Sequence, residues 1–305
     1  MNNLITNIKK AFHKPEILLD RIFSKSIGKW FPDDVYLKIR FRLKMGYPLN
    51  LKAPRTFNEK LQWLKLNDRQ PEYTKMVDKL AVKDYVATLL GEEYIIPTLG
   101  VWEKAEEIDF DSLPNQFVLK CNHDSATVTV VRDKSKLNRE ETIKKYNRFL
   151  KRNYYSRGRE WPYKDVPRRV LAEKYIEPCP GENDLPDYKF FCFNGEVKLF
   201  KVDFDRFIEH HANYYDRKGL LLPFGETVCP PQYEKIIRIP ESLHLMILAA
   251  EKIAQKMSFV RVDFYDHKDI FYFGEITFYP ASGLGKFEPM EWDSKLGDML
   301  FLPIN

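Results

Sequence analysis

Two carboxylates near the end of the chain are placed where they could bind a divalent cation. The segments FVRVDFY (259–265) and IFYFGEITF (270–278) are rich in aromatic and β-branched residues, and a short polar stretch between them predicts a β-hairpin. This hairpin would put Asp263 and Glu275 on paired strands, with Thr277 on the same face as Glu275. Charges inside apolar strands are costly unless they are neutralised, and Mg²⁺ prefers oxygen ligands. The pattern therefore favours a magnesium site, although a solvated sheet face would also account for it.

Three lysines in apolar surroundings could supply the positive charge of a phosphate site. Lys120 ends the segment FVLK, Lys174 lies inside LAEKYI, and Lys189 precedes FFCF. A single lysine of this kind is often a salt-bridge partner or a surface residue. Three of them beside a carboxylate hairpin indicate a triphosphate site, in which point charges hold the phosphates and Mg²⁺ bridges them.

The elements that must position these side chains alternate between helices and strands after residue 76. The first 70 residues are predicted to be mainly helical, and the capping-box spacing from Thr56 to Glu59 predicts a helix that begins near Phe57. A hairpin is expected around Asn194-Gly195, a dipeptide typical of two-residue β-turns. We expect further helices over residues 78–90, 138–152 and 241–257, and strands over 117–120, 128–131 and 170–176.

The positive charge of the chain is concentrated in two segments. The 305 residues include 49 Lys and Arg against 44 Asp and Glu, a formal net charge of +5. Residues 1–30 carry six basic against two acidic side chains, and residues 144–174 carry eleven against three. Because the basic charge is confined to two segments, it argues against a protein whose whole surface binds nucleic acid and favours local contacts with anions. Residues 1–30 also have the apolar spacing of short amphipathic helices, which either contact a membrane surface or pack on their own domain.

Several classes of protein are excluded. No apolar run approaches the ~20 residues that cross a bilayer, and the N-terminus lacks the apolar core of a secretory signal, so we expect a cytoplasmic protein. The four cysteines have no C-x-x-C spacing and are interpreted as free thiols. The motifs of phosphate-loop nucleotide-binding proteins, zinc proteases and serine hydrolases (G-x-x-x-x-G-K-[ST], H-E-x-x-H and G-x-S-x-G) are absent. If the protein binds a nucleotide, it therefore does so in another way.

Four motifs follow one another between residues 76 and 285. They are DKLAVK (78–83), FVLK with CNHDS (117–125), EKYI (173–176), and RVD with EITFYPASG (261–263 and 275–283). Their order resembles that of the ATP-grasp ligases and, more narrowly, of the TupA-like branch, which is associated with teichuronopeptide and other bacterial surface polysaccharides. The resemblance implies an α+β ATP-grasp fold, with two α/β lobes of mainly antiparallel sheets that clasp ATP. The implied division is a helical N-terminal region (1–72), a small lobe (73–178) and a large lobe with the metal site (179–305).

The same resemblance implies ATP and Mg²⁺ as cofactors and assigns roles to individual residues. The nucleotide-binding residues would be Lys83, Lys120, Ser125, Glu173, Lys174, Ile176, and Asp184 or Asp187. Within this set, Lys83, Lys120 and Ser125 would contact the phosphates. Glu173 and the backbone near Lys174 and Ile176 would contact adenine, and one of the two aspartates would contact the ribose. The metal ligands would be Asp263, Glu275 and Thr277, the catalytic residues Arg261 and Lys189, and the acceptor residues Arg206, His211 and Ser282.

Two departures from the pattern of the family concern the phosphates and the metal. Residues 121–131 contain no glycine, whereas the corresponding loop is glycine-rich in many ATP-grasp proteins, so His123, Ser125 or Thr127 would have to assist the backbone. Thr277 stands where the E-x-N motif has asparagine, and it still offers an oxygen ligand.

The reaction implied is the formation of an amide through an acyl phosphate. We expect the carboxylate to be that of a uronic acid in a surface polysaccharide or its precursor, and the nucleophile to be an amino acid or a simple amine. The basic segment 144–174 supports an acidic glycan partner, because its arginines alternate with Tyr154, Tyr155, Trp161 and Tyr163. A solvated basic helix and loop would give the same composition.

Two other functions are compatible with the sequence. Asp203-Phe204-Asp205 follows an apolar strand, where many nucleotide-sugar glycosyltransferases hold a divalent metal. The glycine-free loop is also consistent with a catalytically inactive nucleotide-binding module.

Overall fold

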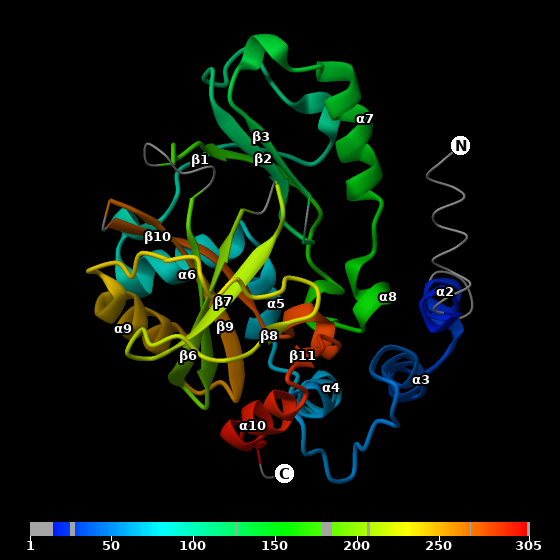
Figure 1. Cartoon of the computed structure of the whole chain (residues 1–305). Helices are drawn as coiled ribbons and strands as arrows, with labels where there is room; N and C mark the ends of the chain where they lie inside the picture. The colour runs from blue at the N-terminus through cyan, green and yellow to red at the C-terminus, as the bar shows by residue number, and fades with distance from the viewer. Residues whose placement is uncertain are drawn as a thin grey trace.

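Two antiparallel sheets form the two lobes, and helices from the N-terminal part of the chain pack beside and below the larger one (Figure 1). The computed structural model describes residues 15–24, 28–125, 127–178, 185–205, 208–268 and 270–303. The helices are α2 (Pro15–Ile22), α3 (Asp33–Met45), α4 (Phe57–Asn67), α5 (Glu72–Val77), α6 (Ala81–Leu90), α7 (Arg139–Leu150), α8 (Tyr154–Gly158), α9 (Leu243–Ala254) and α10 (Glu291–Met299). None of the helices in these ranges is long and apolar enough to cross a membrane.

The small lobe is a four-stranded sheet in the order β1-β4-β2-β3. Its strands are β1 (Thr98–Trp102), β2 (Phe117–Cys121), β3 (Val128–Val131) and β4 (Val170–Lys174). Helix α7 packs against it and begins where predicted, because the Asn138 side chain accepts a hydrogen bond from the amide of Glu141 and satisfies one of the free donors of the first turn. The Tyr146 hydroxyl donates to the carbonyl of Leu119 at 2.7 Å and fixes this helix on the sheet.

The large lobe is a five-stranded sheet in the order β10-β9-β5-β6-β7. Its strands are β5 (Asp187–Phe193), β6 (Glu196–Phe204), β7 (His211–Asp216), β9 (Phe259–His267) and β10 (Ile270–Thr277), and the short pair β8 (Gly225–Glu226) and β11 (Phe287–Glu288) lies beside it. The turn between β5 and β6 is the predicted Asn194-Gly195, with φ of 51° and 84°, as a two-residue hairpin turn requires. Both hairpins that were predicted in this lobe are confirmed.

The N-terminal helices join the large lobe. Helix α4 begins at Phe57 with the predicted capping box, in which Thr56 accepts from the amide of Glu59. Residues 57–86, from α4 to α6, belong to the same apolar core as the large sheet, although the sequence analysis assigned residues 73–90 to the small lobe. A separate apolar cluster around Tyr36 and Phe41 holds α3. Residues 1–14, which carry part of the predicted N-terminal helices, lie outside the described residues.

Two of the predicted elements that proved too long end beside the candidate site. The helix expected over 78–90 begins only at Ala81, because the backbone at Asp78 is extended and the Lys79 amide donates to the carbonyl of Asn122 at 3.1 Å. The Asn122 side chain in turn donates to the Asp78 carboxylate at 2.9 Å. Strand β4 ends at Lys174 instead of residue 176. In both places the regular secondary structure stops at a segment that borders the candidate functional site described below.

Candidate functional site

The last hairpin positions the two predicted carboxylates. Strands β9 and β10 pair Glu275 with Asp263 and Thr277 with Arg261, and the register shifts at Gly274. A side chain at Gly274 would approach the carbonyl of Asp263 to 3.1 Å, so glycine allows the bulge that brings Glu275 opposite Asp263. The predicted placement of the two carboxylates on paired strands is confirmed.

Arg261 binds all three residues that were predicted to hold the metal. Its Nε and Nη2 contact Asp263 Oδ1 and Oδ2, each at 2.7 Å. The same Nη2 contacts Thr277 Oγ1 at 3.0 Å and Glu275 Oε1 at 3.3 Å. Burial alone would lower the pKa of Arg261, but the charge and hydrogen bond of Asp263, together with the charges of Glu275 and Asp187, outweigh burial and raise the pKa well above its usual value. The three oxygen-bearing side chains therefore converge on one cationic position.

Lys189 forms the next part of the cluster on the neighbouring strand β5. Its Nζ lies 2.8 Å from Asp263 Oδ2, is paired with Asp187, and is 3.6 Å from Asp203 Oδ2. Burial lowers the pKa of Lys189, and the surrounding aspartates, Asp187 first, raise it further than burial lowers it. The sequence analysis expected Asp187 to meet ribose, but its carboxylate is buried and paired with Lys189 and does not line either cavity described below.

Lys79 is a member of the site that the sequence analysis missed. Its Nζ lies 3.0 Å from Glu275 Oε2 in the large lobe and donates to the carbonyl of Asp124 at 2.9 Å in the loop after β2. The pKa of Glu275 is held far below its usual range: burial acts to raise it, and the charges of Lys79 and Arg261 outweigh that effect. Lys79 lies four residues before Lys83 in DKLAVK, so the motif that suggested Lys83 also contained this second lysine.

Lys83 and Lys120 meet at Glu173 in the small lobe. Each lysine Nζ lies 2.6 Å from one oxygen of the Glu173 carboxylate. Burial would raise the pKa of Glu173, but the two lysines lower it, Lys120 more than Lys83. Glu173 is therefore ion-paired with the two predicted phosphate lysines, and it is not among the residues that line the cavity at the adjacent linker.

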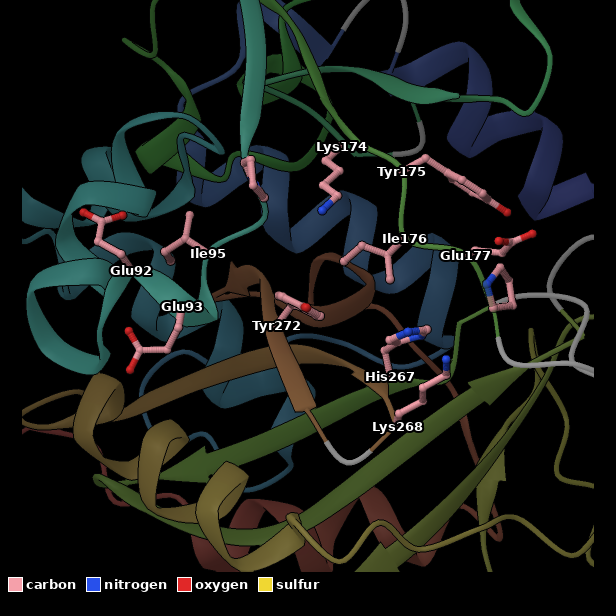
Figure 2. Close-up of a pocket in the computed structure, with 12 residues that line it drawn as sticks. Glu92, Glu93, Ile95, Lys174, Tyr175, Ile176, Glu177, His267, Lys268 and Tyr272 are labelled. Carbon is pink, nitrogen blue, oxygen red and sulfur yellow. The ribbon is translucent and has the colours of Figure 1, made fainter. Parts of the chain in front are cut away.

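The first cavity lies where β4 ends, has a volume of about 670 Å³, and includes two predicted adenine-binding residues (Figure 2). Lys174 and Ile176 point into it from the linker, and Tyr272 and His267 approach from the β9–β10 hairpin on the other side. The Nδ1 atom of His267 is buried without a hydrogen-bond partner among the described residues. Asp184, the other residue expected at the ribose, lies outside the described residues.

A second cavity of about 330 Å³ borders the Arg261 cluster. The residues that line it are Arg40, Ser125, Tyr154, Arg157, Gly158, Glu160, Tyr163, Arg261, Glu275, Thr277, Tyr279, Ala281 and Ser282. It contains the predicted acceptor residue Ser282 and also Ser125, which was expected at the phosphates and here shares a 3.0 Å hydrogen bond with the Tyr154 hydroxyl. His211 lines neither cavity; its Nδ1 lies 2.9 Å from the carbonyl of Pro230. Arg206 lies outside the described residues.

The donor set at the hairpin fits Mg²⁺. In the described part of the chain no group of three histidine, cysteine, aspartate or glutamate side chains is arranged to hold a metal. The hairpin instead supplies two carboxylates and a hydroxyl, whose oxygens all lie within 3.3 Å of Arg261 Nη2. Oxygen-only ligands that leave positions for phosphate are the usual environment of Mg²⁺.

The sequence profile of the TupA-like ATPgrasp family matches residues 59–301. The chain belongs to the TupA-like ATP-grasp family. Its fold is accordingly that of the ATP-grasp proteins, with the two lobes and the N-terminal helices described above. No curated protein matches the chain.

Solved structures similar to this ATP-grasp chain share little sequence with it. D-alanine–D-alanine ligase from Bacillus anthracis, complexed with ATP, is 18% identical over 74% of this chain and 63% of that chain, with a TM-score of 0.41. A RimK domain ATP-grasp protein from Sphaerobacter thermophilus is 14% identical over 76% and 70%, with a TM-score of 0.42. The ATP-grasp ligase PsnB, complexed with a precursor, Mg and ADP, is 10% identical over 92% and 71%, with a TM-score of 0.40. The chain spans less than two thirds of the length of the first of these.

Proposed function

We propose that the protein is an ATP-dependent carboxylate–amine ligase that works through an acyl phosphate. The observation that carries the proposal is the position of Arg261, which binds Asp263, Glu275 and Thr277 and also lines the second cavity. A carboxylate in that cavity would lie beside the cations that must neutralise a transferring phosphoryl group. Membership of the ATP-grasp family supports the same conclusion.

The nucleotide is assigned to the first cavity and the lysines next to it. Adenine would bind between the linker residues Lys174 and Ile176 and the Tyr272 side chain, where the cavity is large enough for a nucleoside. The phosphates would extend toward Lys79 and Lys120. Lys120 directly precedes the glycine-free loop, and Lys79 donates to the carbonyl of Asp124 within it, so side-chain charge would replace part of the backbone cradle.

In the first step, an oxygen of the acceptor carboxylate attacks the γ-phosphorus and ADP leaves with the electrons of the broken bond. In the second, the amine nitrogen attacks the acyl carbon, the C–O bond to phosphate breaks, and the nitrogen loses a proton. Mg²⁺, held by Asp263, Glu275 and Thr277, would supply charge neutralisation at the phosphates. Arg261 and Lys189 hold positive charge beside the reacting groups, and the cavity wall orients the carboxylate for in-line attack.

The acceptor is proposed to be a uronic acid of a bacterial surface polysaccharide or its precursor. Exposed basic side chains of the segment 144–174 support an acidic glycan; Arg152, for example, lies 4.2 Å from the ring centroid of Phe149 and leaves its charge at the surface. Arg159 does not belong to this surface, because it is buried and donates to the carbonyl of Gly28 at 2.9 Å. The proposed glycan surface therefore consists of the exposed arginines and lysines of the segment 144–174, which do not include Arg159.

Peripheral contact with the inner face of the plasma membrane remains part of the proposal. On α2, the side chains of Leu18, Leu19 and Ile22 are exposed by 45 to 52%, which leaves an apolar face open. The sequence on either side of this helix is basic, with Lys9, Lys10 and Lys14 before it and Lys25 after it. Such a contact would place the enzyme beside a lipid-linked glycan precursor.

The glycosyltransferase alternative conflicts with the surroundings of its metal motif. Asp203 is buried, and its carboxylate lies 3.6 Å from Lys189 and 3.4 Å from Lys201. Asp205 is paired with Lys235. Both carboxylates of the D-x-D sequence are thus paired with lysines and line neither cavity, whereas Glu275 and Thr277 of the proposed metal site line the second one.

The ligase is tested with ATP, Mg²⁺, hydroxylamine and a panel of uronic acids. We expect ADP and an acyl hydroxamate to form together, and Glu275→Gln to abolish both. An inactive nucleotide-binding module would instead bind ATP without turnover. Background ADP formation with every carboxylate would refute the ligase.

A further inference from the structure

One wall of the second cavity is a short segment, residues 154–160, whose other side rests on the N-terminal helices. Its residues Gly158 and Glu160 line the cavity. From the same segment, the Tyr155 hydroxyl donates to the Asp33 carboxylate at the start of α3 at 2.7 Å, and α8 lies beside α3 (Figure 1). The shape of this cavity wall therefore depends on helices that do not themselves belong to either lobe.

Arg159 shows that the N-terminal region holds the wall in a conformation that the local sequence disfavours. Its φ of 53° lies in the left-handed region, which a non-glycine residue enters only at a cost in free energy. Its Nη2 donates to the carbonyl of Gly28 at 2.9 Å, and its Cζ lies 4.3 Å from the centroid of the Tyr36 ring. Such strain persists where surrounding structure imposes it, and here the N-terminal region supplies these contacts.

Arg40 of α3 connects this support to the cavity itself. It lines the cavity, and its Nη1 donates to the carbonyl of Arg157, which also accepts from the Tyr36 hydroxyl at 2.8 Å. Its Nε donates to Asp20 Oδ1 of α2 at 3.0 Å, and both side chains of this ion pair are buried. Because Asp20 already balances its charge, Arg40 contributes to the cavity mainly through the position in which it holds the wall.

Helices α2 and α3 precede the residues that match the family profile, which begins at residue 59. We propose that these two helices are a functional part of the acceptor site, in which Arg40 is a positioning residue that holds the cavity wall through the Arg157 carbonyl and Asp20 fixes Arg40. The inference rests on the proposed ligase function and identifies the part of the chain that sets its affinity for the acceptor. Of the described residues, none before Glu92 lines the first cavity, so the nucleotide should bind independently of α2 and α3.

The test measures KM for the acceptor and for ATP separately, with hydroxylamine as the nucleophile and the uronic acid that yields the most hydroxamate as the acceptor. Arg40→Gln should raise KM for the uronic acid at least tenfold and leave KM for ATP and kcat within about threefold. Lys44 lies 3.2 Å from Asp20 and still neutralises it in this variant. Arg40→Lys should recover only part of the loss, because an ammonium group lacks the planar fork that reaches both acceptors.

A double substitution tests whether Asp20 acts through Arg40. Asp20→Asn should raise KM for the uronic acid about fivefold, although Asp20 does not line the cavity. Adding Asp20→Asn to Arg40→Gln should change this KM no further, because the two residues form one unit. Asp34→Asn and Lys38→Gln, which each remove one partner of an exposed ion pair on α3, are the matched controls and should leave both KM values unchanged.

The outcomes separate this inference from the proposed function. Absence of hydroxamate with the wild-type protein would overturn the ligase and the inference with it. With an active wild type, an unchanged KM for the uronic acid in Arg40→Gln would overturn the inference alone. Equal rises in KM for the uronic acid and for ATP would also overturn it, because they would show a general loosening of the fold. Additive effects of the two substitutions would refute the link from Asp20 through Arg40.

The melting temperature and ATP binding of each variant show whether it is folded. If Arg40→Gln does not fold, the conservative Arg40→Lys decides the question by the same comparison of the two KM values. A selective rise in KM for the uronic acid would support the inference, and its absence would overturn it.

Discussion

Lys79 provides the sharpest test of how the two lobes cooperate. It is the side chain that joins Glu275 on β10 to the carbonyl of Asp124 in the loop after β2. At 3.0 Å, and with an effective dielectric constant of about 20, its attraction for Glu275 is on the order of 5 kcal/mol before desolvation is subtracted. Replacing it with methionine keeps the length of the side chain but removes the charge.

We expect Lys79→Met to lower kcat for hydroxamate formation by about 10²–10³-fold, the loss typical when one preorganised group that stabilises charge is removed. Lys79→Arg should recover only part of this loss, because it restores the positive charge on a guanidinium group whose shape differs from that of the lysine ammonium group. The control is Lys75→Ala on α5, which removes an exposed lysine from the same region. ADP release and hydroxamate would be measured at saturating ATP.

Substitutions of Lys79 and Lys83 should have different effects. Lys79→Met should affect turnover, whereas Lys83→Met should act on the Glu173 ion pair in the small lobe and mainly weaken ATP binding. Activity of Lys79→Met within threefold of the wild type would refute the assignment of Lys79 to the reacting phosphates. Unchanged thermal unfolding would confirm that any loss is chemical.

Three further predictions concern stability and location. Thr56→Ala removes the capping box of α4 and should reduce the free energy of unfolding by about 1 kcal/mol in urea titrations; an unchanged midpoint would contradict the role of the cap. Burial lowers the pKa of Lys65 to about 7, so from about pH 7 to 10 the unfolded chain binds more protons and stability should rise with pH. In urea unfolding, the free energy of unfolding of the wild type should increase relative to that of Lys65→Met by up to ~1.4 kcal/mol per pH unit. A difference between the two proteins that does not change with pH would argue against this role of Lys65. Deletion of residues 1–30 should reduce flotation with anionic liposomes, and equal recovery of both proteins would exclude the membrane contact.

The local elements were predictable because their signals are contained in a few neighbouring residues. The capping box at Thr56, the N-cap at Asn138 and the Asn194-Gly195 turn each satisfy or shape the backbone within four positions, so tertiary structure does not change them. The helix over 78–90 failed for the opposite reason. Its first residues form hydrogen bonds with Asn122, more than 40 positions away, and the pattern of neighbouring residues contains no information about such a distant partner.

The sequence by itself determined the family, the hairpin that carries Asp263 and Glu275 on paired strands, and the presence of lysines in apolar segments, because motif order and strand patterns are properties of the chain alone. The register shift at Gly274, which sets Glu275 directly opposite Asp263, was seen only in the structure. Only the tertiary structure decided which charges pair. It joined Lys83 and Lys120 to Glu173, and it placed Lys79 across the lobes. It also brought Glu160 and Arg157 into a cavity with Arg261. Ion pairing depends on distances between segments that are far apart in sequence, and those distances are set by how the lobes and N-terminal helices pack.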